Sequence, residues 1–308
     1  MRILILRSGA LGDTLMLLPA VQALRPRADI LLVGRPPGLG FLRPYVHRAV
    51  SIEGPGWHRL YMEDPESAQG PPMPEADIVA ALVQDPEGIV RRNLRTLIPA
   101  GAVYRFPPLP LEGDETHVAL YTARCLREAG CPLDPDGCIA RALTGPLLAT
   151  GDRPGREGIV FHPGSGSPGK NHPPAFWLHL AGAFAEHSSL QDEPLRILLG
   201  PAEEKDRALF AEGTKGARLC LQPDRAGLLS LLGGARLYVG HDSGITHLAA
   251  MLGTPTVALF RDTPVHRWRP LGPAVAVVAG RDREIAPDRV VKEATELLDR
   301  ILATGTRR

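Results

Sequence analysis

The polar segment at residues 240–247, with the sequence Gly-His-Asp-Ser-Gly-Ile-Thr-His, offers the densest set of reactive groups in the chain. Residues 237–239 before it are typical of a buried strand and residues 248–252 after it of a helix, which predicts a strand-to-helix turn. Free backbone N–H groups and the positive end of the helix dipole meet at such a turn and favour a phosphate or diphosphate. The alternative is an ordinary capped helix with incidental histidines. The candidate ligand-binding residues are Asp242, Ser243, Gly244 and His247.

A second turn, residues 163–170 with the sequence Pro-Gly-Ser-Gly-Ser-Pro-Gly-Lys, follows an apolar run and precedes an expected helix. Its N–H groups and the Ser165 hydroxyl would hold phosphate oxygens, while the Lys170 ammonium neutralises their charge. The order of residues is not that of a Walker A motif. The alternative is a flexible surface loop, because the segment is rich in turn formers.

Asp13 lies in a third turn, where the first expected strand runs into Arg-Ser-Gly-Ala-Leu-Gly-Asp-Thr. Gly9 and Gly12 would let the backbone approach a ligand at the carboxyl end of a strand, where open α/β sheets bind ligands. A carboxylate there, at a helix that begins near Asp13 or Thr14, could remove a proton from a hydroxyl nucleophile. The alternative role for Asp13 is a helix N-cap.

A fourth turn, after residues 195–199, contains Glu203 and Glu204. A carboxylate at this strand end could accept hydrogen bonds from ribose hydroxyls, and Glu203 is the candidate. It could equally be a first-turn acid that complements the helix dipole.

These turns must be positioned by alternating strands and helices, which predicts an α/β fold with parallel sheets. We expect two Rossmann-like domains, residues 1–150 and 151–308, facing a cleft. The Pro- and Gly-rich segment 131–157 is the expected linker, and the last helix could pack on either domain. Strands are expected at residues 3–6, 30–33, 77–83, 103–106, 158–162, 195–199, 218–221, 237–239, 256–260 and 274–278, and helices at residues 15–24, 88–98, 115–130, 174–187, 203–213, 224–232, 244–252 and 287–303.

Composition excludes several classes of protein. Among 308 residues, 35 are basic and 34 acidic, and this net charge of +1 gives no support to nucleic-acid binding. Residues 1–50 contain seven arginines and two aspartates, and this basic face would attract an acidic acceptor or an anionic membrane surface, unless the arginines are merely solvated. No window is long and apolar enough to span a membrane.

The remaining sequence signals favour a reduced, metal-free protein. Four cysteines have no zinc-site spacing and are expected to be reduced thiols in a cytoplasmic protein. The one Asp-x-Asp string, at residues 134–136, lies in the expected linker, so we interpret it as a loop feature rather than a metal site. The cysteines are Cys125, Cys131, Cys138 and Cys220.

In the order and spacing of these turns, over nearly its whole length, the chain resembles the bacterial ADP-heptose:lipopolysaccharide heptosyltransferases of glycosyltransferase family 9. The resemblance is carried by Arg7-Ser8-x-x-x-Gly12-Asp13, by the Pro163-Gly164-Ser165 turn leading to Lys170, by the Gly200 turn with its acids, and by Asp242-Ser243-Gly244-x-x-His247. It implies the glycosyltransferase B fold, with the acceptor in the N-terminal half and the nucleotide sugar in the C-terminal half. It also implies inversion at the anomeric carbon, with no metal and no cofactor.

Residue by residue, the resemblance implies that Asp13 is the general base and that Lys170 contacts the donor phosphates. Asp242 would bind sugar hydroxyls, Ser243 and Gly244 would bind the diphosphate through N–H groups, and His247 would complete the pocket. The implied partners are ADP-heptose or a similar nucleotide sugar and a lipopolysaccharide-core or similar glycan acceptor, with peripheral contact at the cytoplasmic face of the inner membrane.

Two departures and two alternative functions accompany the resemblance. The family often has Lys-x-Trp-Pro where this chain has Lys170-Asn171-His172-Pro173, and the acid after Gly200 fits either Glu203 or Glu204. The alternatives are a sugar-nucleotide 2-epimerase of the same fold and a non-catalytic sugar-nucleotide-binding protein. A dehydrogenase is disfavoured because no complete Gly-x-Gly-x-x-Gly occurs at a strand-to-helix turn.

Overall fold

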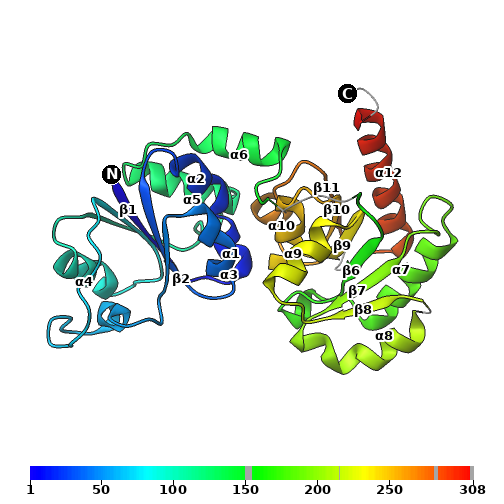
Figure 1. The fold of residues 1–308 in the computed structure, drawn as a ribbon, viewed down its shortest axis with the longest axis horizontal. Helices are drawn as coiled ribbons and strands as arrows, with labels where there is room; N and C mark the ends of the chain where they lie inside the picture. Colours follow the sequence, from blue (N-terminus) through cyan, green and yellow to red (C-terminus); the bar gives the residue numbers. More distant parts are fainter. Residues whose placement is uncertain (150–154, 215, 281–283, 306–308) are drawn as a thin grey trace. The chain divides into compact units, whose positions relative to one another are not determined.

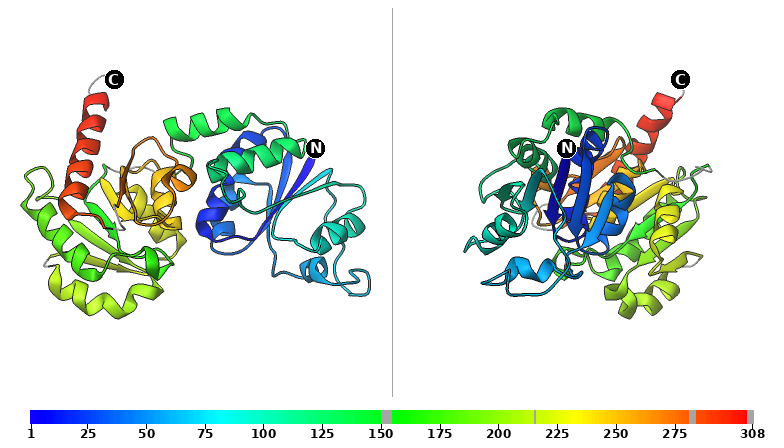
Figure 2. Two further views of the ribbon diagram at one scale, coloured as in Figure 1. Left: turned by 180° about the vertical axis from the view of Figure 1, so that it is seen from behind. Right: turned by 60° about the vertical axis from the view of Figure 1, so that its left-hand side comes forward.

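The computed structural model of the chain describes residues 1–149, 155–214, 216–280 and 284–305. Contacts divide it into two compact units, Met1–Arg141 and Ala142–Arg308, each with its own parallel sheet (Figures 1 and 2). The described part of the chain has no helix of the length and apolar character that a membrane span requires.

Unit 1 (Met1–Arg141) has five parallel strands in the order β3-β2-β1-β4-β5. Helix α4 and the 3-10 helix Trp57–Tyr61 cover one face of this sheet, while α1, α2, α3 and α5 lie on the other (Figure 1). The central strands are buried on both faces, as parallel strands require. The elements are β1 (Arg2–Arg7), α1 (Leu11–Leu15), α2 (Leu18–Leu24), β2 (Asp29–Gly34), α3 (Gly38–Leu42), β3 (Arg48–Ser51), β4 (Ile78–Leu82), α4 (Ile89–Leu97), β5 (Ala102–Phe106), α5 (Val118–Glu128) and α6 (Pro135–Thr144).

Unit 2 (Ala142–Arg308) has six parallel strands in the order β11-β10-β9-β6-β7-β8. Numbered from its own first strand, this is the 3-2-1-4-5-6 order of the dinucleotide-binding fold. Helices α7, α8 and α12 lie on one face and α9 and α10 on the other (Figure 1). The elements are β6 (Ile159–His162), α7 (Pro174–Glu186), β7 (Leu195–Leu199), α8 (Arg207–Gly213), β8 (Arg218–Leu221), α9 (Arg225–Gly233), β9 (Leu237–His241), α10 (Gly244–Met251), β10 (Thr256–Phe260), α11 (Val265–Trp268), β11 (Val275–Ala279) and α12 (Pro287–Gly305).

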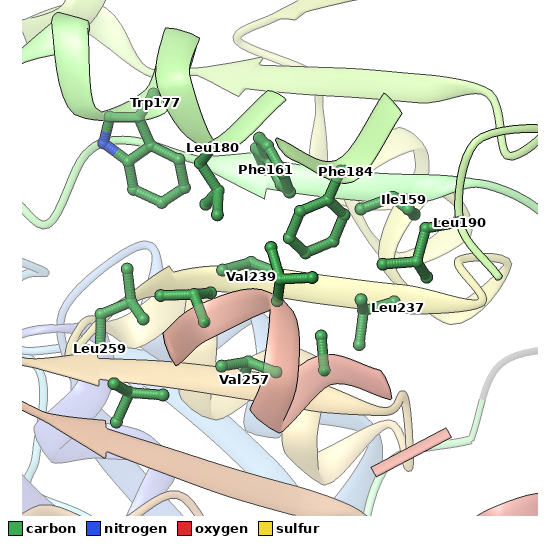
Figure 3. Close-up of a cluster of buried hydrophobic side chains, with 14 of the residues drawn as sticks. Ile159, Phe161, Trp177, Leu180, Phe184, Leu190, Leu237, Val239, Val257 and Leu259 are labelled. Atoms are coloured by element: carbon green, nitrogen blue, oxygen red, sulfur yellow. The ribbon is translucent and has the colours of Figure 1, made fainter. Parts of the chain in front are cut away.

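The core of unit 2 lies between its sheet and the α7 face. Phe161 and Val239 from neighbouring strands meet Trp177, Leu180 and Phe184 of α7 (Figure 3). Phe161 packs edge-on against Phe184, with ring centroids 5.1 Å apart. This apolar layer holds β6 and β9 side by side, so the turns that leave their carboxyl ends start from a rigid base.

Several predicted elements differ from the observed ones. The division between the units falls at 141/142 rather than 150/151, because the Leu147 and Leu148 N–H groups donate to the Met251 carbonyl, 2.8 and 2.9 Å away, in unit 2. The predicted linker contains helix α6, and its residues 150–154 lie outside the described residues. The last helix, α12, packs on unit 2, against α7, β10 and β11.

The Asp-x-Asp string was wrongly interpreted as a loop feature. Pro135 is the first residue of α6, and the Cys138 N–H group donates to the Asp134 carbonyl at 3.0 Å. Proline is favoured at this position because its missing N–H group needs no partner there. Asp136 is exposed and lies 3.9 Å from the Arg124 guanidinium.

The four cysteines are free thiols, as predicted. Burial raises the pKa of both Cys125 and Cys131 to about 11, so neither forms a reactive thiolate near neutral pH.

Candidate functional site

The candidate site of unit 2 lies at the carboxyl ends of β6 and β9, which are neighbours at the centre of the sheet. The chain leaves β6 toward α7 on one face and leaves β9 toward α10 on the other. Strand order reverses between these two strands, and this switch point is where open α/β sheets bind ligands.

Asp242 lies at the centre of this site. Its side chain is only 6% exposed, and Oδ2 accepts a hydrogen bond from Lys170 Nζ at 2.8 Å. The other oxygen, Oδ1, lies 3.7 Å from His247 Nε2. Burial alone would raise the pKa of Asp242, but the nearby His247 and Lys170 outweigh it and lower this pKa to about 2. The structure therefore brings together three of the predicted residues around an ionised carboxylate.

Ser243 is the N-cap of α10, and its hydroxyl accepts a hydrogen bond from the Thr246 N–H group at 3.3 Å. The capping alternative is therefore correct for Ser243, although it does not explain the charged groups next to it. The N–H groups of Gly244 and Ile245 have no acceptor within the helix, because they belong to its first turn. They remain available to an anion at the positive end of the dipole.

The loop after β6 carries Lys170 at the end of a 3-10 turn, Pro168–Lys170. The Lys170 side chain is 35% exposed. The Ser165 hydroxyl donates to the Ser167 carbonyl at 2.9 Å, so in this structure it shapes the loop itself. Gly166 has a φ of +70°, which favours glycine at this turn.

Glu203 rather than Glu204 lies against the loop after β6. The Gly200 N–H group donates to Glu203 Oε2 at 3.1 Å, and the carboxylate lies so close to Gly164 that a Cβ there would be 2.4–2.6 Å from its atoms. Glu203 is buried, whereas Glu204 is exposed and lies 3.4 Å from the Arg207 guanidinium.

Three buried histidines surround these residues, and the sequence analysis assigned none of them a role: His162, His172 and His241. Two of them end strands, β6 and β9, after apolar runs. The sequence signal that could have identified these two is a histidine directly before a Pro-Gly or Asp-Ser turn. Burial lowers the pKa of His162 to about 4.

In unit 1, Asp13 lies at the switch point between β1 and β4, in the turn that leaves β1. Helix α1 begins at Leu11, earlier than predicted, and Ala10 rather than Asp13 is its N-cap. Asp13 Oδ2 accepts a hydrogen bond from the Ala10 N–H group at 3.1 Å, and Oδ1 lies 3.7 Å from the Arg7 guanidinium. Its side chain remains 27% exposed, so part of it is accessible from solvent.

The two glycines of this turn have different surroundings. A Cβ on Gly9 would lie 2.6 Å from the Cβ of Asp13, so glycine is needed for the carboxylate to fold back over the turn. Gly12 is the second residue of α1. Arg7 is buried and donates to the Pro108 carbonyl, and burial lowers the pKa of its guanidinium, opposed by the charge of Asp13.

The predicted basic face of residues 1–50 has less free positive charge at the surface than its count of arginines suggested. Arg7 is buried, while Arg2 lies beside Glu75 and Asp77. A groove of about 420 Å³ elsewhere in unit 1, beside the edge strand β5, is lined by basic residues of α4 and β5. Those residues are Arg91, Arg95 and Arg105.

Across the described ranges, no group of three or more histidine, cysteine, aspartate or glutamate side chains is arranged to hold a metal ion. The site is instead built from a lysine, an aspartate and a histidine at a helix N-terminus. That combination suits an anionic group with adjacent hydroxyls.

Comparison with known proteins gives one family. The model of glycosyltransferase family 9 (heptosyltransferase) matches residues 140–298. Among curated proteins, lipopolysaccharide heptosyltransferase 1 of Pseudomonas aeruginosa is 37% identical over 117 residues, which are 38% of this chain. The matched part spans 32% of that relative's length.

Solved structures share the fold over almost the whole chain. Escherichia coli heptosyltransferase WaaC with ADP has a TM-score of 0.69 and 19% identity, covering 96% of this chain and 100% of that one. The structure of the same enzyme with ADP-2-deoxy-2-fluoro heptose has a TM-score of 0.66 and 21% identity, and the match covers 96% of this chain and 99% of that one. The family 9 glycosyltransferase of Veillonella parvula has a TM-score of 0.73 and 17% identity, and the match covers 96% of this chain and 97% of that one. The predicted fold class, two Rossmann-like α/β units of the glycosyltransferase B type, is confirmed.

Proposed function

The chain belongs to glycosyltransferase family 9, the heptosyltransferases, and we propose that it transfers a heptose from ADP-heptose, or a related sugar from an ADP-sugar, to a hydroxyl of a lipopolysaccharide-core or similar glycan acceptor. The observation that carries the proposal is the group formed by Lys170, Asp242 and His247 at the N-terminus of α10. The structures of WaaC with ADP and with ADP-2-deoxy-2-fluoro heptose support this choice of donor.

The donor diphosphate binds between Lys170 and the first turn of α10. The Lys170 ammonium and the N–H groups of Gly244 and Ile245 stabilise the negative charge that grows on the leaving ADP. Asp242 is ionised and can only accept hydrogen bonds, which suits it to the hydroxyls of the transferred sugar. Glu203, buried beside the same loop, accepts from the ribose.

Asp13 is the general base. Its carboxylate takes the proton of the acceptor hydroxyl while that oxygen attacks the anomeric carbon of the donor. The bond between this carbon and the diphosphate oxygen breaks, and ADP leaves with the electron pair. Attack opposite the leaving group inverts the anomeric centre. No metal enters this scheme, because the charge on the diphosphate is neutralised by Lys170 and the helix N-terminus.

The acceptor is proposed from the family and from charge. A phosphorylated, lipid-linked core glycan is anionic, and the groove of Arg91, Arg95 and Arg105 offers it positive charge on unit 1. The same charge would support peripheral contact with an anionic membrane surface.

Two measurements test the proposal. Thermal stability in the presence of ADP, UDP, GDP and NAD should rise most with ADP, because selective binding stabilises the native state by mass action. Asp13→Asn, which keeps an acceptor for the Ala10 N–H group, should reduce turnover with ADP-heptose by about 10²- to 10⁴-fold and leave ADP affinity nearly unchanged.

The matched control is Asp136→Asn, which removes an exposed carboxylate on α6 and should leave turnover unchanged. The proposal is wrong if NAD stabilises the protein better than ADP. It is also wrong if Asp13→Asn retains full turnover, or if the protein converts the donor alone to an epimerised sugar.

A further inference from the structure

The loop that carries Lys170 is tied to β9 by two buried histidines. His172, two residues after Lys170, donates its backbone N–H group to His241 Nε2 at 2.9 Å, and its ring Nδ1 lies 2.8 Å from the same atom. His172 is 8% exposed and His241 is fully buried. The two residues therefore form a direct hydrogen-bonded link between the loop after β6 and the end of β9.

The geometry assigns the donor and the acceptor between the two facing ring nitrogens. A backbone N–H group can only donate, so His241 Nε2 must be an unprotonated acceptor. The His172 Nδ1 must then carry a proton, because two lone pairs would repel each other at 2.8 Å. His172 is therefore the donor and His241 the acceptor of this ring-to-ring hydrogen bond.

The surroundings keep the pair neutral. Burial lowers the pKa of His241 to about 3, helped by His172, by His162 and by Arg261. Burial, with the charge of Arg261, lowers the pKa of His172 to about 4. The pair therefore keeps one protonation state at pH values near neutrality.

Aromatic packing fixes both rings in place. The His172 ring stacks on Phe176 of α7, with centroids 4.0 Å apart and planes 18° apart. Trp177, also on α7, meets the His241 ring edge-on at 5.2 Å. Arg261, just after β10, donates to the Asn171 carbonyl. Residues 171–172 are therefore held by α7, by β9 and by the segment after β10.

This link lies next to both members of the Lys170 and Asp242 ion pair. Lys170 precedes His172 by two residues, and Asp242 directly follows His241. Between the packed Gly164 and Lys170 the loop has less support, since the Ser165 hydroxyl donates to Ser167 within the loop and residues 166–169 are exposed. Fixing residue 172 therefore limits where the Lys170 ammonium can reach.

We propose that His172 and His241 are positioning residues that hold Lys170 at the diphosphate site, a role that rests on the proposed function. His172 and His241 do not contact the donor in this scheme and act only through Lys170.

Calorimetric titration of the full chain with ADP tests the role. His241→Leu and His172→Phe, which remove the acceptor and the ring donor, should each weaken ADP binding about tenfold, the size of one buried hydrogen bond. His241→Asn, whose amide oxygen can accept from His172, should recover most of the affinity. His179→Leu, at an exposed position on α7, is the matched control and should bind as the unmodified chain does.

A double-mutant cycle separates positioning from general destabilisation. If His241 acts through Lys170, His241→Leu should weaken ADP binding in the unmodified chain but change little in a Lys170→Ala background. Equal effects in both backgrounds would overturn the inference, as would unchanged affinity in His172→Phe and His241→Leu. If His241→Leu does not fold, the same cycle with His172→Phe decides. Failure of the unmodified chain to bind ADP would instead contradict the proposed function.

Discussion

At the scale of single residues, the two carboxylates of the proposed reaction have separate tasks. Asp242 is buried between Lys170 and His247, with a pKa of about 2, so it stays ionised and can neither donate nor usefully accept a proton near neutral pH. Asp13 keeps 27% of its side chain exposed. This difference in environment supports the proposed roles, in which Asp13 takes the proton and Asp242 binds hydroxyls.

Gly164 and Gly169 give a matched pair of predictions in one loop. An alanine at 164 would place its Cβ 2.4–2.6 Å from the Glu203 carboxylate, whereas nothing lies within 4 Å of a Cβ at 169. Gly164→Ala should therefore displace the Glu203 carboxylate from the Gly200 N–H group, lower the free energy of unfolding by about 0.5–1.5 kcal/mol and weaken ADP binding. Gly169→Ala should leave both nearly unchanged.

Chemical denaturation and ADP titration of these two variants check this prediction. Equal behaviour of Gly164→Ala and Gly169→Ala would show that Glu203 does not pack against the loop as observed. A loss of ADP affinity confined to Gly164→Ala would support the placing of Glu203 beside the nucleotide.

At the scale of elements, the two strands of the candidate site both end in a buried histidine, and this makes stability depend on pH. Burial lowers the pKa of His162 from 6.5 to about 4, so the unfolded state binds the proton first as pH falls. The contribution of each such histidine to the free energy of unfolding should be constant above pH 6.5. As the pH falls from 6.5 to the folded pKa, it should decrease by about 1.4 kcal/mol per pH unit.

His162→Leu isolates one of these contributions. Its free energy of unfolding, from denaturant titrations at pH 7 and pH 5, should fall less than that of the unmodified chain. Between pH 7.5 and 8.5 the two proteins should show parallel behaviour, because the histidines are neutral in both states. A drop between pH 7 and 5 as large as in the unmodified chain would show that His162 is protonated in the folded protein.

The elements also show what the sequence could predict. Most strands were predicted because runs such as Ile3 to Leu6 are buried on both faces and are therefore continuously apolar. Strand β3 was missed because Arg48–Ser51 is short and half-exposed. Helix α6 was missed because Pro135 and Gly137 are breakers inside a helix, yet proline is favoured in its first turn.

The candidate site was predictable only in part, for a physical reason. Lys170 and Asp242 could each be found from a turn at a strand end, because such turns are local in sequence. The link between His172 and His241 joins residues 69 positions apart, and nothing local indicates it. Once the strand order places β6 beside β9, these turns become neighbours, and the contacts follow from the topology.

At the scale of the whole molecule, the two units use the same topological position for different chemistry. Each proposed functional turn follows the first strand of its unit: Asp13 after β1 and Lys170 after β6. Each unit also has its own sheet and its own buried core. We therefore expect donor binding and proton removal to be separable by mutation, since each belongs to a unit with its own stability.

Calorimetric unfolding of the full chain tests this independence. Leu94→Ala, in the core of unit 1, should lower the temperature of that unit's unfolding transition, because truncating such a buried leucine costs about 2–5 kcal/mol. Gly164→Ala should lower the transition of unit 2 and so identify it. ADP at about 100 times its Kd should then stabilise the unit 2 transition by about 2.7 kcal/mol and leave the other unchanged. A shift confined to the transition that Leu94→Ala marks would place the nucleotide in unit 1 and contradict the assignment of the donor to Lys170 and Asp242.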